Sequence, residues 1–335
     1  MTRPPSERHG KDIEDLIVDF SAEPPFALGR FSRDGQRPFD GLSLRGRVVP
    51  LQDTPAAGLA MFDDWDRLVD TLSNWSEDHG EDGVPVDELH THAPVVPGGL
   101  FCSGANYREH VIELVVAQQI EQQPGEDKET LRSRAAAAMD ERAAQGRPYA
   151  FVGLPSAICG PYDDVILPEY GTQHDWEVEL GVVIGRTGRH VPRDRAFDHV
   201  AGYTIVNDIT ARDLVFRPDI PGIGSDWLAS KNAPTFFPTG PYVVPAAFVD
   251  PADLGLVLRL NGEVMQNGRT SDMIFDVARL IEYVSTFTEL RPGDLLITGS
   301  PAGNGAHHGR YLQPGDLLES EITGLGTQRN RCVAG

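Results

Sequence analysis

The chain has few cysteines, no long apolar run and a shortage of basic residues. Its three cysteines, Cys102, Cys159 and Cys332, lie far apart and form neither a metal-binding spacing nor an even disulfide framework. No stretch approaches the roughly 18 consecutive apolar residues of a membrane helix. The first residues, MTRPPSERHGKDIEDL, lack the apolar centre of a signal peptide. These absences predict a cytoplasmic protein with no membrane association.

Acidic residues outnumber basic ones by 50 to 29, which gives a formal net charge of −21. Such a field repels nucleic acid and anionic membranes, so neither is an expected partner. An acidic substrate would need a locally positive site. With 335 residues, of which 40% are hydrophobic, the chain is long enough for one large domain or two domains.

Two regions are expected. A smaller N-terminal accessory domain is predicted over residues 1–95. In it, short alternating segments between Phe26 and Val49 indicate antiparallel strands, and the apolar spacing of Phe62–Trp75 indicates a helix. Residues 96–335 predict the catalytic domain, in which strand-like runs alternate with Gly and Pro turns around one clear helix at 276–290. The predicted class is therefore α+β and mainly β.

Residues 115–148 interrupt the catalytic domain. A polar stretch, QQIEQQPGEDKE, is followed by ETLRSRAAAAMDERAA, which is rich in strong helix formers. The segment has little apolar stripe, so it is predicted to be either a surface insertion or a mobile helical lid.

Three carboxylates are the strongest chemical signal. Glu177 and Glu179 alternate along a predicted strand and therefore point to the same face. Asp208 ends a second apolar run and can supply a third oxygen. Carboxylates that lose their hydration need a compensating cation, and an all-oxygen set suits Mg²⁺ or Mn²⁺, with Ca²⁺ as a further candidate. The alternative is a solvated pair of glutamates on an edge strand.

Two further segments carry candidate catalytic groups. In NYREHVIEL, His110 and Glu113 share a helix face, as a water-activating base and its orienting carboxylate would; the alternative is a surface pair. Lys231, between Trp227 and Phe236, is either a substrate anchor or electrophile, or a surface residue whose aliphatic part packs on its neighbours.

Candidate substrate contacts come from two places. Arg212 is a candidate carboxylate clamp, or else a counter-charge for Asp213 or Asp208. The sequence PGDLLITGSPAGNG at 292–305 predicts a strand ending in a Gly-rich turn, where Thr298 or Ser300 and backbone N–H groups can hold a carboxylate. The alternative is a purely structural turn. The segment lacks the lysine and the spacing of a nucleotide-binding loop.

The order ANYREHVIE, HDWEVELGVVIG, NDITARD, SKNAPTFFPTGPYVV, NGEVMQNGRTSDMIF and RPGDLLITGSPAGNG resembles the fumarylacetoacetate hydrolase superfamily. The resemblance covers about residues 101–114 and 155–320. Residues 1–95 and 115–148 are covered poorly. The chain departs from the usual pattern at Ser300, where the family has Thr, at Asn304, where it has a small apolar residue, and at Met265, where Arg is frequent.

The resemblance implies a mixed β-sandwich roll, a homodimer, and Mg²⁺ or Mn²⁺ held by Glu177, Glu179 and Asp208. It also implies a base built from His110 and Glu113, with Lys231 as a polarising partner. The family glutamine that contacts substrate matches Gln266.

These features together predict a metal-dependent hydrolase that cleaves a C–C bond in a β-dicarbonyl 2-oxo acid of the acylpyruvate or fumarylacetoacetate type. Within the same fold, a 2-oxo-acid decarboxylase acting on an oxaloacetate-like substrate, or a 2-hydroxydienoate isomerase or hydratase, are alternatives that use the same enolate chemistry. A metal-stabilised binding protein without turnover is the alternative from another class. The presence of His110 and Glu113 beside the three carboxylates argues against it.

Overall fold

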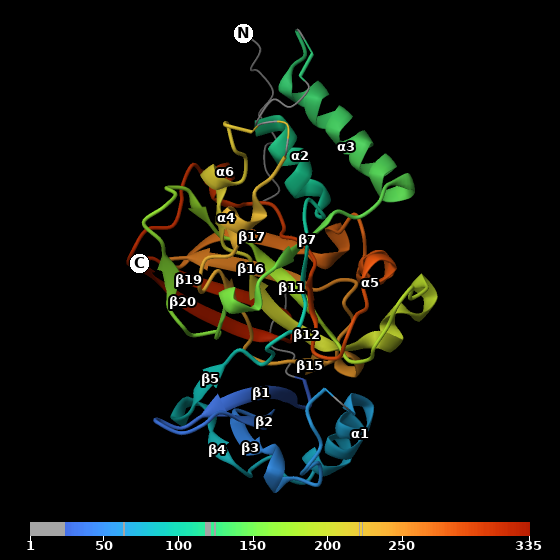
Figure 1. Cartoon of the computed structure of the whole chain (residues 1–335), viewed down its shortest axis with the longest axis vertical. Helices are drawn as coiled ribbons and strands as arrows, with labels where there is room; N and C mark the ends of the chain where they lie inside the picture. The colour runs from blue at the N-terminus through green and yellow to red at the C-terminus, as the bar shows by residue number, and fades with distance from the viewer. Residues whose placement is uncertain (1–23, 63, 118–121, 124, 221, 223) are drawn as a thin grey trace, which may run out of the picture.

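The computed structural model describes residues 24–335 except 63, 118–121, 124, 221 and 223. Predictions for residues 1–23 of the N-terminal region, and for residues 118–121 and 124 of the insertion, lie outside the described residues. The architecture is α+β with strands predominating, as the sequence predicts (Figure 1). Within the described part, no helix combines the length and apolar character needed to cross a membrane.

The N-terminal region forms an antiparallel five-stranded sheet in the order β4-β3-β2-β1-β5, drawn in blue and teal at one end of Figure 1. The strands are β1 (Ala27–Ser32), β2 (Phe39–Leu44), β3 (Arg47–Pro50), β4 (Val84–Pro85) and β5 (His90–His92). Helix α1 (Trp65–Ser76) packs beside them and buries Leu68 and Leu72 completely. Its apolar side chains recur at helical spacing, which explains why one face is buried.

A six-stranded sheet forms the centre of the molecule, in the order β15-β12-β11-β18-β6-β7. Its strands are β6 (Leu100–Ser103), β7 (Ala150–Gly153), β11 (Val178–Ile184), β12 (Val200–Asn207), β15 (Val244–Pro245) and β18 (Leu295–Ile297). Strands β18 and β6 are parallel, and the other neighbours are antiparallel. Every residue of β11 and β12 is buried, as expected for nearly continuous apolar runs.

A second sheet of five strands packs in the same half of the molecule, in the order β17-β16-β19-β20-β9. Its strands are β9 (Val165–Leu167), β16 (Gly255–Leu260), β17 (Glu263–Arg269), β19 (Leu317–Ile322) and β20 (Gly326–Ala334). Two short pairs complete the strands that the structure describes: β8 (Ile158–Cys159) with β14 (Phe237–Pro238), and β10 (His174–Asp175) with β13 (Thr210–Ala211).

The remaining described α-helices surround the sheets. Helix α5 (Val277–Phe287) corresponds to the helix predicted at 276–290. Helices α2 (Arg108–Ala117) and α3 (Lys128–Gln145) pack against each other, and α3 projects away from the body of the protein in Figure 1. Helices α4 (Trp227–Lys231) and α6 (Gly305–His308) are short and lie on the same side as α2.

The apolar core crosses the predicted boundary at residue 95. One buried cluster combines Leu28 and Leu68 from the N-terminal region with Val183 and Val243 from the central body. Leu28 and Val243 also exchange two backbone hydrogen bonds of 2.9 and 2.7 Å. The two regions therefore share packing and hydrogen bonding, whatever their separate roles.

Candidate active site

Three carboxylates meet at one end of the central strand pair. Glu177 immediately precedes β11, Glu179 lies within it, and Asp208 immediately follows β12. The antiparallel register places Glu179 opposite Val206, and the Asp208 backbone N–H donates to the Glu177 carbonyl oxygen at 2.9 Å. Each residue offers one carboxylate oxygen within 4.8 Å of those of the other two. All three are buried, so the solvated alternative does not apply.

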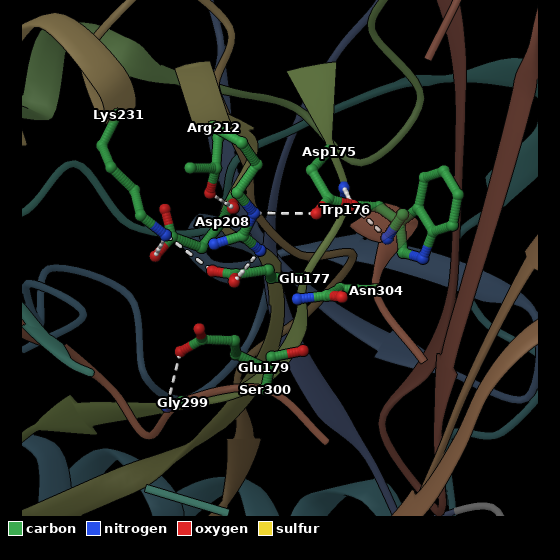
Figure 2. A network of polar contacts seen from close by, with 12 residues as sticks. Asp175, Trp176, Glu177, Glu179, Asp208, Arg212, Lys231, Gly299, Ser300 and Asn304 are labelled. Atoms are coloured by element: carbon green, nitrogen blue, oxygen red, sulfur yellow. Dashed lines mark hydrogen bonds and ion pairs between the residues drawn. The ribbon is translucent and has the colours of Figure 1, made fainter. Parts of the chain in front are cut away.

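Two cationic side chains neutralise part of this charge (Figure 2). The Lys231 ammonium donates hydrogen bonds of 2.6 Å to Glu177 Oε2 and 2.6 Å to Asp208 Oδ2. Lys231 is the last residue of helix α4 and lies in the interior, where it is 3% exposed. The alternative prediction, that Lys231 is a surface residue, is therefore wrong. Arg212 follows β13 and donates through Nη2 to Glu177.

A fourth carboxylate, that of Asp175, is not among the residues predicted from the sequence. Its Oδ2 accepts a 2.8 Å hydrogen bond from Arg212 Nε, and its Oδ1 accepts from the backbone N–H of Gly305 at 2.5 Å. Arg212 is thus the counter-charge of Asp175 and Glu177, rather than of Asp213 or Asp208. The signal was present, because Asp175 continues the every-second-residue alternation of the two glutamates.

Burial and this charge arrangement shift the pKa values of the carboxyl groups in opposite directions. Burial works to raise the pKa of Glu177, but Arg212 and Lys231 outweigh it and bring that pKa to about 2. Burial raises the pKa of Asp208 to about 7 against the effect of Lys231. Burial, reinforced by Asp208 and Glu177, also raises the pKa of Glu179 well above its usual value. Glu179 therefore bears the least compensated charge.

The carboxylates line a cavity of about 490 Å³, which is within the usual range for small-molecule sites. His110 from α2, Lys231 and Arg212 also line it. Part of the cavity lining is apolar and includes the Phe151 and Trp227 rings, which stack with centroids 4.6 Å apart. A small polar head group and an apolar or extended tail can therefore be accommodated together.

The predicted His110–Glu113 partnership is not made in this structure. His110 is buried in the cavity wall, and burial lowers its pKa to about 4, although Glu177 acts in the opposite direction. The Glu113 carboxylate instead lies 3.2 Å from His307 Nδ1 of α6, and Glu113 is not among the cavity-lining residues. Sequence reasoning did not foresee this contact, because it joins residues almost 200 positions apart.

The predicted substrate-binding residues fall into two groups. Ser300 and Arg212 line the cavity. Thr298 and Gln266 are fully buried and do not line it. The Gln266 amide is satisfied internally, because its Oε1 accepts from the Val178 N–H at 3.0 Å and its Nε2 donates to Ser300 Oγ at 2.7 Å.

The carboxylate set fits a divalent cation. Four carboxylates, those of Asp175, Glu177, Glu179 and Asp208, face the two cations Lys231 and Arg212, which leaves a formal charge of −2 when all six are ionised. Asp208 Oδ1 is buried and has no hydrogen-bond partner among the described residues. An orphaned carboxylate oxygen beside uncompensated charge is the environment that hard cations prefer.

Comparison with known proteins agrees with this fold. The family model for the fumarylacetoacetate (FAA) hydrolase C-terminal domain matches residues 99–333. The chain belongs to the fumarylacetoacetate hydrolase superfamily, and the resemblance noted in its sequence is confirmed. Members of this family are enzymes that act on small-molecule acids.

Individual relatives differ in reaction. A 2,4-didehydro-3-deoxy-L-rhamnonate hydrolase from Sphingomonas sp. (strain SKA58) is 46% identical over 74% of this chain and 75% of its own length. A mitochondrial oxaloacetate tautomerase from Homo sapiens is 37% identical over 75% of this chain and 71% of its own length. The structure of 2-hydroxyhepta-2,4-diene-1,7-dioate isomerase from Mycobacterium marinum superposes with a TM-score of 0.64 at 28% identity, covering 92% of this chain and 98% of that one.

Proposed function

We propose that this protein is a divalent-metal-dependent hydrolase that acts on a 2,4-dioxo acid and cleaves the C–C bond between the methylene carbon and the distal carbonyl carbon. The observation that carries the proposal is the presence of a buried imidazole, His110, in the wall of the cavity that contains the carboxylate triad. The similarity to the 2,4-didehydro-3-deoxy-L-rhamnonate hydrolase supports it further.

Glu177, Glu179 and Asp208 would hold the cation, with Mg²⁺ or Mn²⁺ the first choices and Ca²⁺ the next, because all donors are carboxylate oxygens. When bound, such a cation polarises substrate oxygens and stabilises negative charge as a Lewis acid. Lys231 contributes positive charge beside the same carboxylates, so it would favour the negatively charged enolate that forms during cleavage.

His110 would act as the general base. Because its pKa lies near 4, the imidazole is neutral at pH 7 and one ring nitrogen can accept a proton. It would take a proton from water as the water oxygen attacks the distal carbonyl carbon. The C–C bond then breaks, one fragment leaves as a carboxylic acid, and the other leaves as the enolate of a 2-oxo acid. That enolate receives the proton from His110 at carbon, so atoms and charges balance.

Glu113 would orient His110 only after a rearrangement. In this structure Glu113 pairs with His307, which belongs to α6. For Glu113 to support His110, this contact would have to break when substrate binds and α2 moves over the cavity. The insertion that follows α2 would then act as a lid.

The direct test is to incubate the purified protein and Mg²⁺ with 2,4-dioxopentanoate and to measure the pyruvate and acetate formed. We expect stoichiometric release of both products. We expect none from the Glu179→Gln variant, which retains the shape of the side chain but loses its charge. Consumption of the substrate without release of acetate would contradict hydrolysis.

Tautomerisation or decarboxylation of oxaloacetate is the second candidate, favoured by the 37% identity to an oxaloacetate tautomerase. The structural similarity to a hydroxydienoate isomerase places isomerisation in the same group. None of these reactions needs an attacking water, so decarboxylation in particular should survive loss of His110 better than hydrolysis does. Supplying oxaloacetate and following carbon dioxide and the enol absorbance separately distinguishes the candidates.

The homodimer implied by family resemblance stays a prediction. Light scattering coupled to size-exclusion chromatography measures the mass directly, and we expect twice the 36.6 kDa of one chain.

A further inference from the structure

Asn304 presents a buried amide donor to the active-site cavity. Its side chain is only 2% exposed and lines the cavity together with Glu177 and Glu179. Its Nδ2 has no hydrogen-bond partner among the residues that the structure describes. Figure 2 shows the amide nitrogen on the side that faces the two glutamates. A donor in this position is available to a ligand.

The direction of this amide follows from its second contact. Asn304 is the N-cap residue of α6, and its Oδ1 accepts a hydrogen bond of 3.3 Å from the backbone N–H of His307. If the amide were rotated by half a turn, its NH₂ group would face that N–H, and two donors would oppose each other. The cap therefore requires the oxygen to point to the helix and the nitrogen to point to the cavity.

Several other donors in or next to the cavity are engaged within the protein. The Gln266 NH₂ group donates to Ser300 and to the Pro301 carbonyl oxygen. Arg212 donates from Nε and Nη2 to internal carboxylates, which occupy the edge that would hold a substrate carboxylate with two parallel bonds. Lys231 donates to two carboxylates. The positive charges of the site are therefore already balanced.

We propose that Asn304 is a substrate-binding residue whose Nδ2 donates a hydrogen bond to a carboxylate oxygen of the bound 2-oxo acid. The ligand class rests on the proposed function, and the donor itself rests on the geometry. An anionic head group entering a cavity with surplus negative charge needs donors that carry no internal partner. A neutral amide supplies one without disturbing the ion pairs of Lys231 and Arg212. Burying that donor unpaired is costly, so a ligand acceptor restores the lost hydrogen bond.

The test measures binding rather than turnover. Oxalate, an unreactive mimic of the 2-oxo-acid head group, is titrated calorimetrically into the protein at saturating Mg²⁺. Asn304→Ser removes the amide NH₂ group and retains a shorter side chain whose oxygen can cap α6, whereas Asn304→Leu removes both the amide and the cap. Asn267→Ser, in β17 and away from the cavity lining, is the matched control.

Both Asn304 variants should bind oxalate about 10- to 100-fold more weakly, as expected when a hydrogen bond to a charged group is lost. Affinity for Mg²⁺ without oxalate should not change, and Asn267→Ser should bind oxalate like the wild type. Weakening in Asn304→Leu alone would show that the cap matters and the donor does not, which overturns the proposal. An equal loss of Mg²⁺ affinity would also overturn it, because Asn304 would then act through the carboxylates.

The two proposals fail in different ways. If wild-type protein with Mg²⁺ binds no oxalate, the assignment to 2-oxo acids is wrong, and the role of Asn304 falls with it. If the wild type binds oxalate and both variants bind it equally well, only the role of Asn304 is refuted.

Discussion

Replacing Lys231 with methionine should destabilise the metal-free protein strongly. The change retains most of the side-chain volume but removes an ammonium that lies 2.6 Å from one oxygen of Glu177 and 2.6 Å from one of Asp208. The site would then hold four carboxylates against Arg212 alone. With every group ionised, its formal charge changes from −2 to −3. Because the four carboxylates are buried, water screens the added repulsion only weakly.

The magnitude follows from two opposing terms. At an effective dielectric constant of about 20, two unit charges 2.6 Å apart attract by roughly 6 kcal/mol. Removing the ammonium also relieves its own desolvation, which is several kcal/mol for a buried ion, so breaking such a network costs about 3–5 kcal/mol net. A cation bound by the carboxylates replaces part of the lost positive charge. Saturating Mg²⁺ should therefore narrow the difference between variant and wild type.

Urea unfolding followed by tryptophan fluorescence measures this, first with chelator and then with Mg²⁺. Lys128→Met, at the exposed start of α3, is the control and should change the free energy of unfolding by less than about 0.5 kcal/mol. The reasoning is refuted if Lys231→Met costs no more than this control. It is also refuted if Mg²⁺ leaves the difference between Lys231→Met and wild type unchanged, because the ammonium and the cation would then not share the same carboxylates.

Three further predictions follow from the site. The Glu179→Ala variant should show no binding of Mg²⁺ or Mn²⁺ by calorimetry, whereas the control Glu263→Ala, at an exposed residue, should bind both ions like the wild type. Retained affinity in Glu179→Ala would refute the metal assignment. His110→Ala should slow hydrolysis of 2,4-dioxopentanoate by about 10²–10⁴-fold with metal affinity retained, and unchanged hydrolysis would exclude the base role. Hydrogen exchange in α2 and α3 should slow when oxalate binds at saturating Mg²⁺, as ordering of a lid requires; equal exchange with and without oxalate would identify the insertion as fixed scaffold.

Much of the fold could be predicted because apolar periodicity determines it directly. Strands β11 and β12 are nearly continuous apolar runs, and α5 has a clear helical stripe, so their types follow from the sequence. Strand β20 was not predicted. Its inward positions include Gln328 and Asn330, whose amides hydrogen-bond to backbone carbonyl oxygens in the interior. A polar residue that is buried by tertiary contacts cannot be distinguished from a solvated one by pattern alone.

Some features of the site could be predicted from local sequence, and others could not. Glu177 and Glu179 were found because their spacing along one strand brings them to one face. The burial of Lys231 and the pairing of Arg212 with Asp175 depend on how α4 and the segment after β13 fold back onto β11. The contact of Glu113 with His307 depends on the packing of α2 against α6. Local sequence contains no record of these long-range placements, so the ion pair of Arg212 with Asp175 and the contact of Glu113 with His307 could not be predicted from it.

The apolar cluster shared across residue 95 has a consequence for cooperativity. Because Leu28 and Leu68 pack in the same cluster as Val183 and Val243, neither half can lose its structure without exposing apolar surface of the other. Heat or denaturant should therefore melt the chain in a single transition rather than in two. A fragment beginning at residue 96 would carry an uncovered apolar face and would be prone to aggregate. We therefore expect the N-terminal sheet to contribute to the solubility of the rest of the chain as well as to its stability.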